Sequence, residues 1–217
     1  MKIKIFSACA LLVLLFAGSA LPIFACACCA ESGTYAISTA RPNLYELGIL
    51  KEIQFGDFAD LYMTEAGFDM IRGLTPLEKE YNAPEAAPDN WQLALKSGFT
   101  GKGWRFSITS KGGKTGTLVL PMPLRMVSFK ADIHDNTDKG LGPILYKEFR
   151  FKGTVASGAG TFASGLDRTT SYFLVFQGRG NNCDNAEDFT HWRLEIAGKR
   201  SSYAFFGATA GNDRPAN

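Results

Sequence analysis

The cysteines are the residues whose spacing most clearly suggests chemistry. Cys26, Cys28 and Cys29 form a C-x-C-C cluster, and Cys183 lies far away in an acidic segment. Thiols in an oxidising compartment form disulfides. Because Cys183 falls outside the strand patterns, we predict that it pairs with Cys28 or Cys29 and ties down the N-terminal segment. The alternative is that the cluster, with a nearby histidine, holds zinc or copper.

Two segments rich in Asp and Asn are the next candidates. Calcium takes about six to eight oxygen ligands, which such segments can supply. Neither segment has the EF-hand order of acidic positions, and Asp and Asn are also common turn formers. Solvated turns are therefore the competing interpretation. The candidate metal ligands are Asp132, Asp135, Asp138, Asp184, Glu187, Asp188 and His191.

No motif assigns catalytic residues. A triad needs a nucleophile, a base and an orienting partner, and the only histidines are His134 and His191. No G-x-S-x-G motif occurs. Trp104 and Trp192 fall on the apolar sides of expected strands, so core packing fits them better than sugar stacking. Catalytic residues stay unassigned, and a hydrolase without a recognisable motif remains an alternative.

The first 25 residues have the layout of a secretory signal. Lys2 and Lys4 precede an apolar run over residues 8–17, and small residues follow near a cleavage site after residue 25 or 27. We expect export to the periplasm or secretion. Residues 23–26 also resemble a bacterial lipobox, so lipidation of Cys26 and an outer-membrane lipoprotein form the alternative.

Composition narrows the class of protein further. The chain has 217 residues, of which 46% are hydrophobic and 12% aromatic, and its formal charge is +2. This composition excludes a largely disordered chain. Loss of both signal lysines leaves 21 basic against 21 acidic residues (23 minus 2). A near-neutral chain does not favour a nucleic-acid partner, and we expect no transmembrane segment after processing.

An alternation of apolar and polar residues with a period of two predicts an all-β fold. It places Phe106 and Leu194 on core faces, and the glycines at 112 and 113 favour a hairpin turn. Residues 153–165 are expected to form a flexible hairpin connection. The strand segments fall near residues 91–95, 104–109, 117–120, 127–133, 149–152, 172–176, 192–196 and 203–206.

The region between residues 31 and 90 is harder to interpret. Residues 49–55 and 59–64 could be strands, and three prolines indicate an irregular segment near 73–90. We therefore expect a single β domain over 28–210 and a flexible tail over 211–217. The predicted fold is an antiparallel β-sandwich of about nine strands, with a closed lipocalin-like barrel as the alternative.

The function expected from these features is a broad class. We expect an exported, non-enzymatic protein that binds a small ligand or a protein, or has a structural role. A metal-binding protein and a β-sandwich hydrolase are the alternatives. No cofactor is assigned beyond the calcium, zinc or copper hypotheses.

Overall fold

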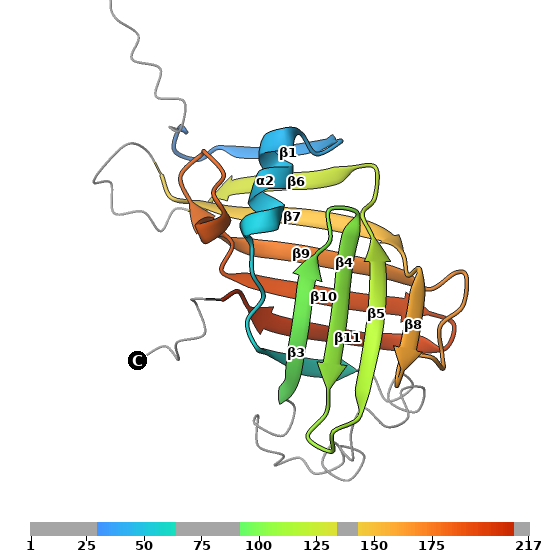
Figure 1. Cartoon of the computed structure of the whole chain (residues 1–217). Coiled ribbons are helices and arrows are strands. Elements are labelled where there is room, and N and C mark those ends of the chain that lie inside the picture. Colours follow the sequence, from blue (N-terminus) through green and yellow to red (C-terminus); the bar gives the residue numbers. More distant parts are fainter. Residues whose placement is uncertain (1–29, 64–91, 134–142, 211–217) are drawn as a thin grey trace, which may run out of the picture.

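The computed structural model describes residues 30–63, 92–133 and 143–210. These residues form one antiparallel sheet of eleven strands, one α-helix and a short 3-10 turn, η2 (Ala186–Asp188) (Figure 1). The helix is α2 (Leu44–Glu52). The strands are β1 (Tyr35–Ala40), β2 (Phe58–Met63), β3 (Gln92–Phe99), β4 (Gly103–Thr109), β5 (Thr115–Pro121), β6 (Met126–Asp132), β7 (Leu145–Thr154), β8 (Ser157–Gly160), β9 (Ser171–Gly180), β10 (His191–Gly198) and β11 (Ser201–Ala208).

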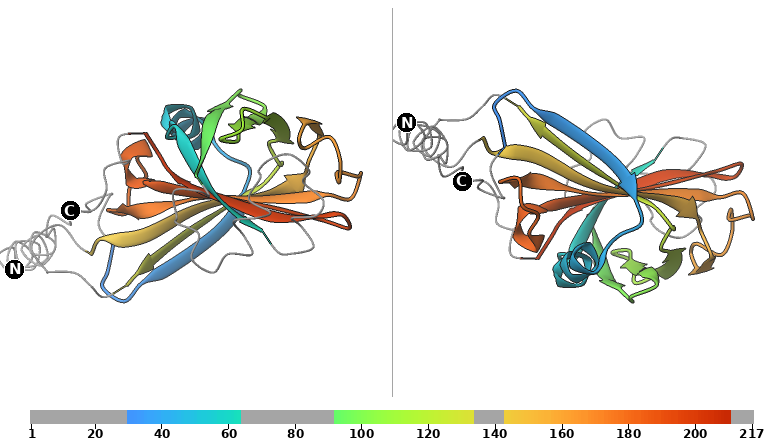
Figure 2. Two further views of the ribbon diagram at one scale, coloured as in Figure 1. Left: turned by 90° about the horizontal axis from the view of Figure 1, so that it is seen from below. Right: turned by 90° about the horizontal axis from the view of Figure 1, so that it is seen from above.

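The sheet folds over on itself and makes two layers. Its order is β1-β6-β7-β9-β10-β11-β2-β3-β4-β5-β8. Strands β3, β4 and β5 cross over the layer of β7, β9, β10 and β11 at a steep angle (Figures 1 and 2). β2 forms the corner, because residues 58–60 pair with β3 while residues 60–63 pair with β11. The sheet is open, so the sandwich expectation is confirmed and the closed barrel is not.

Aromatic rings fill the space between the layers. Phe55 lies 5.1 Å from Phe106, 5.5 Å from Phe176 and 5.3 Å from Trp192, measured between ring centroids. Trp104 lies 4.7 Å from Phe151 in an edge-to-face contact. Such pairs add to the free energy gained by burying the rings. The alternation thus has a direct cause, since each strand that shows it has one face in contact with this core.

The expected core faces are confirmed. Phe106 and Leu194 are both fully buried. Trp104 and Trp192 are also buried, as expected from their positions on apolar faces. The Gly-Gly turn joins β4 to β5, and Gly113 has a φ of 78°, a left-handed conformation that favours glycine.

The expected strand over residues 49–55 is wrong, because most of this segment belongs to helix α2. A capping box starts the helix. The Asn43 side chain accepts a hydrogen bond from the Glu46 N–H at 2.9 Å, and the Glu46 carboxylate accepts one from the Asn43 N–H at 2.8 Å. This pairing satisfies two N–H groups that a helix start leaves without partners. The N-x-x-E spacing was the sequence signal that could have revealed the helix.

Two strands were not expected from the sequence. Within the described part of the chain no apolar layer covers β1, and all six of its residues are exposed. β8 lies inside the expected flexible connection over residues 153–165 and pairs with β5. The connection does join the antiparallel neighbours β7 and β9, so its hairpin character is confirmed. Within it, however, the chain leaves one layer and β8 pairs with the edge of the other. These two strands account for the excess over the expected nine.

Some expectations fall outside the described residues. They concern the signal segment, the irregular segment near 73–90, the first residue of the strand expected near 91–95, His134 and the tail over 211–217. In the part of the chain that is described, no helix has both the length and the apolar character needed to cross a bilayer.

We predict that Phe106→Ala lowers the free energy of unfolding by about 3–5 kcal/mol, because the lost ring leaves a cavity in the core. The exposed neighbour Arg105 provides the control, and Arg105→Ala should change stability by about 0.5 kcal/mol or less. Chemical denaturation of both variants measures the difference. A larger loss for Arg105→Ala would show that the two faces of β4 are assigned the wrong way round.

Candidate functional site

The acidic loop, residues 181–188, packs closely against the end of β9. A Cβ added to Gly178 would lie 1.7 Å from the backbone oxygen of Asp188, and one added to Gly180 would lie 2.2 Å from its carboxylate. Neither separation is possible for a real side chain. The two glycines therefore let the loop turn back over the strand, and they place the Asp188 carboxylate on the sheet.

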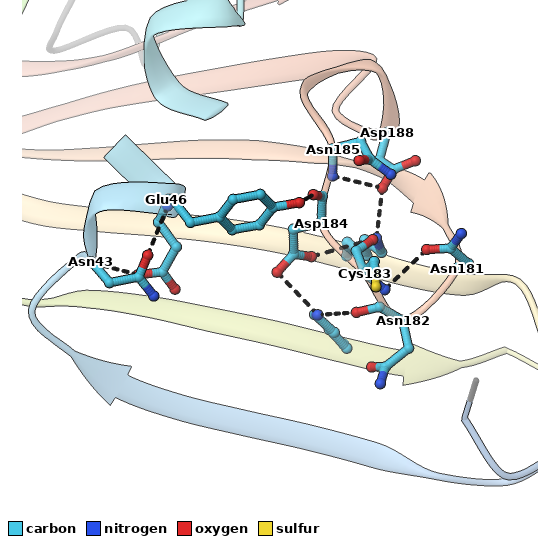
Figure 3. A network of polar contacts seen from close by, with 11 residues as sticks. Asn43, Glu46, Asn181, Asn182, Cys183, Asp184, Asn185 and Asp188 are labelled. Carbon is cyan, nitrogen blue, oxygen red and sulfur yellow. Dashed lines mark hydrogen bonds and ion pairs between the residues drawn. The ribbon is translucent and has the colours of Figure 1, made fainter. Parts of the chain in front are cut away.

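Two lysines under this loop explain why it is acidic. Lys130 of β6 and Lys147 of β7 are direct cross-strand neighbours, an arrangement that brings like charges together. Asp184 lies between them, with its carboxylate oxygens 3.0 Å from the Lys130 Nζ and 3.4 Å from the Lys147 Nζ. Asp188 lies 2.6 Å from the Lys147 Nζ. Two carboxylates thus balance two ammonium groups in a network seen in Figure 3.

Burial makes this network a strong constraint on the loop. The Lys147 side chain is only 1% exposed, and its Nζ also donates a hydrogen bond to the Cys183 backbone oxygen. The Lys130 Nζ donates a hydrogen bond to the Asn182 backbone oxygen. The Tyr45 hydroxyl donates to the Asp184 backbone oxygen and so links the loop to α2. A buried charge without partners is costly, so these contacts hold the loop in one position.

Of the candidate metal ligands, the structure brings Asp184 and Asp188 together on one lysine, Lys147, and places Asp132 and His191 elsewhere. Asp184 and Asp188 pair with lysine, while the Asp132 carboxylate accepts a hydrogen bond from the Gly33 N–H at 2.6 Å. His191 lies exposed on the face of the sheet opposite the acidic loop, and its Nδ1 is 2.9 Å from the Thr190 hydroxyl. Asp135 and Asp138 lie outside the described residues. Among the residues that are described, no three His, Cys, Asp or Glu side chains gather as a metal site.

A groove of about 430 Å³ lies between α2 and the acidic loop. A second hollow of about 290 Å³ shares Glu52, Ala186 and Glu187 with it and continues past the end of the helix. Sequence reasoning missed this groove because it did not predict α2, although it did select Asp184 and Glu187. The groove is lined by Leu44, Tyr45, Gly48, Ile49, Glu52, Asp184, Asn185, Ala186 and Glu187.

The charges of the groove favour a positively charged group. Glu52 is the last residue of α2, where the carbonyl groups of the helix already carry a partial negative charge. Glu187 lies across the groove on η2. On the apolar side, Leu44 is 88% exposed and Tyr45 is 60% exposed. Besides Asp184, which pairs with lysine, the groove thus combines two carboxylates with apolar surface that a ligand could cover.

The outer face of the sheet carries a second polar array. Arg150 lies 4.7 Å over the Phe129 ring and pairs with Glu148, and the Tyr146 hydroxyl donates to the same carboxylate. Burial and this hydrogen bond raise the pKa of Tyr146 to about 12. The phenol therefore stays protonated at neutral pH. Since these side chains satisfy one another, the array has a clear structural role in covering the face.

The N-terminal cysteines lie outside the described residues, but the chain that follows them is placed. The Thr34 backbone oxygen accepts a hydrogen bond from the Asp132 N–H at 2.9 Å, at the end of β6 that is next to Lys130. The Cys183 N–H donates to the Asn181 side chain at 2.9 Å. The start of β1 and the acidic loop therefore lie at the same end of the sheet (Figure 1).

We predict that Lys147→Met lowers the free energy of unfolding by about 3–5 kcal/mol, because it leaves a carboxylate buried without its cation. Adding Asp188→Asn should recover much of the lost stability, since the remaining charges of Lys130 and Asp184 then neutralise each other. Thermal and chemical denaturation test both variants. The exposed Lys152 on the same strand is the control, and Lys152→Met should have little effect. If the double variant lost as much unfolding free energy as Lys147→Met alone, the contribution of Lys147 would come from its packing and not from its charge.

Comparison of the chain with protein-family models, with curated proteins and with solved structures gives no match.

Proposed function

We propose that this protein is exported and acts as a non-enzymatic binding protein, with its ligand in the groove between α2 and the acidic loop. The observation that carries the proposal is the groove itself. Its volume of about 430 Å³ lies within the range of small-molecule sites, which combine apolar walls with a few polar groups. The loop that forms one wall is held in place by the buried lysine network, so the site is formed before a ligand arrives.

The chemistry of the groove favours a ligand with an apolar body and a positive group. Leu44 and Tyr45 offer exposed apolar surface on one wall. Glu52 and Glu187 offer carboxylates near the end of the helix. A cation placed between them would gain charge-assisted hydrogen bonds, and the partial negative charge at the helix end would add to the attraction. An amine on an aromatic or alkyl body has this combination.

Export and a disulfide form part of the same proposal. The basic and apolar start of the chain supports export, and an oxidising compartment favours disulfides. The start of β1 and the acidic loop share one end of the sheet, which supports a bond from Cys183 to Cys28 or Cys29. Cys183 has an interaction partner in the structure. The N-terminal cysteines lie outside the described residues.

We predict that phenethylammonium binds the protein and that phenylacetate, of similar size and opposite charge, does not. Glu187→Gln and Glu52→Gln should each weaken phenethylammonium binding about tenfold, the usual cost of losing one charge-assisted hydrogen bond. Isothermal titration calorimetry measures the affinities. Glu195→Gln is the control, because Glu195 lies on β10 away from the groove. Equal binding of both probes, or an equal effect of Glu195→Gln, would contradict the proposed site.

We predict that non-reducing peptide mapping of the exported protein recovers Cys183 joined to Cys28 or Cys29, with at least the first 25 residues removed. The chain-entropy model gives roughly 4–5 kcal/mol for so long a loop, as an upper value. Cys183→Ser should therefore lower the melting temperature, and a reductant should lower that of the wild type but not of the variant. Recovery of Cys183 as a free thiol would contradict the pairing. A diacylglyceryl mass on Cys26 would instead favour the lipoprotein.

A further inference from the structure

β1 forms an open edge of the sheet. Among the described residues it pairs only with β6, and its six residues are all exposed. Tyr35 is 70% exposed and Ile37 is 55% exposed. Natural proteins usually protect such an edge with lysine, proline or a bulge. β1 has the sequence YAISTA and keeps an unbroken register with β6, so it carries none of these features.

The backbone groups at this edge can be assigned from the register. Thr34 lies opposite Asp132, and its oxygen accepts a hydrogen bond from the Asp132 N–H. In an antiparallel ladder, alternate residues direct their N–H and C=O groups to the same side. Ala36 and Ser38 therefore point these groups toward β6. Tyr35, Ile37 and Thr39 point theirs outward, to the open edge.

We propose that β1 pairs with β1 of a second copy of this chain, antiparallel and across a two-fold axis at Ile37. In this register Ile37 lies opposite Ile37, and Tyr35 lies opposite Thr39. All three outward-pointing residues then exchange hydrogen bonds with outward-pointing residues of the other copy. A shift by one residue would bring outward groups against inward ones, and a shift by two would leave one of the three outward residues without a partner in β1. The proposed register is therefore the one that uses all three.

The side chains support this pairing over others. Tyr35, Ile37 and Thr39 share the outer face with Phe129, whose ring lies 6.3 Å from the Tyr35 ring. The two-fold axis would place two such apolar groups next to each other and cover them. Cross-strand pairs of aromatic and β-branched residues are favourable contacts within a sheet.

Charge complementarity sets the direction of the strands. Glu31 precedes β1 and Arg41 follows it, and a turn brings Glu31 back to Thr34, whose N–H donates to the Glu31 oxygen. An antiparallel pair places Arg41 of each copy opposite Gly33 of the other, close to Glu31. A parallel pair would bring like charges together at both ends. The edge therefore suits a second copy in the antiparallel direction.

The oligomeric state of the purified protein tests this proposal. One strand pair buries little surface compared with permanent dimers, so we expect a concentration-dependent dimer in analytical ultracentrifugation. Ile37→Lys should weaken the dimer at least about tenfold, because it places two like charges directly opposite each other. Leu124→Lys, at a loop residue that is 82% exposed, should leave the dimer unchanged. A wild type that stays monomeric to several hundred micromolar would overturn the proposal.

A cysteine placed at the two-fold axis tests the register. Opposite residues of a hydrogen-bonded pair have Cα atoms about 5.5 Å apart, within the range of a disulfide. Ile37→Cys should therefore give a covalent dimer under mild oxidation, beyond any background from the native cysteines. Ser38→Cys should not give a covalent dimer, because residue 38 faces the opposite side of the sheet from Ile37 and lies opposite Ala36 of the other copy. Efficient cross-linking of Ser38→Cys but not of Ile37→Cys would overturn the assigned register.

Discussion

Aromatic packing between the two crossed layers is the interaction on which the rest of the structure depends. Phe55 contacts rings from both layers, and it belongs to the segment that joins α2 to the corner strand β2. Packing this ring inward therefore brings the end of the helix toward the core. It also brings the chain into the corner where the sheet folds over. The position of α2 and the fold of the sheet are thus linked through one side chain.

The second layer does not extend over the whole first layer. β1 and β6 lie beyond β3, β4 and β5 (Figure 1), and this part of the sheet needs another cover. α2 and the acidic loop cover β6 and the adjacent end of β7, while the residues of β1 stay exposed. Ile49 and Leu50 are buried, while the loop covers Lys130 and Lys147 with two carboxylates and backbone oxygens. A mixed cover of helix and loop leaves a groove where they meet, which a strand-only cover would not.

The two proposed interaction sites follow from this uneven cover. The groove exists because a cylinder and a compact loop cannot close completely over a sheet. The open edge exists because β1 extends the sheet past its cover, so its outward N–H and C=O groups have no partner strand among the described residues. The sites lie on different features, one on side chains of the covered face and the other on backbone at the edge. Binding at one does not require the other.

The sequence by itself determined the strand pattern and the core. An alternation with a period of two depends only on neighbouring residues, and it placed Phe106, Leu194 and the buried tryptophans correctly. It also selected Asp184 and Asp188 as unusual residues. It could not predict their role, because Lys147 is distant in sequence and lies under the loop only once β7 and β9 are paired.

Only the tertiary structure decided the remaining features. β1 carries too little apolar pattern to be recognised, and its pairing with β6 joins residues far apart in the chain. The helix that forms the groove depends on a capping box in a segment whose apolar residues also fit a strand. Fold class follows from local periodicity, whereas the groove, the buried ion pairs and the open edge arise from contacts between distant segments. Those contacts form only when burying the aromatic core brings the two layers together.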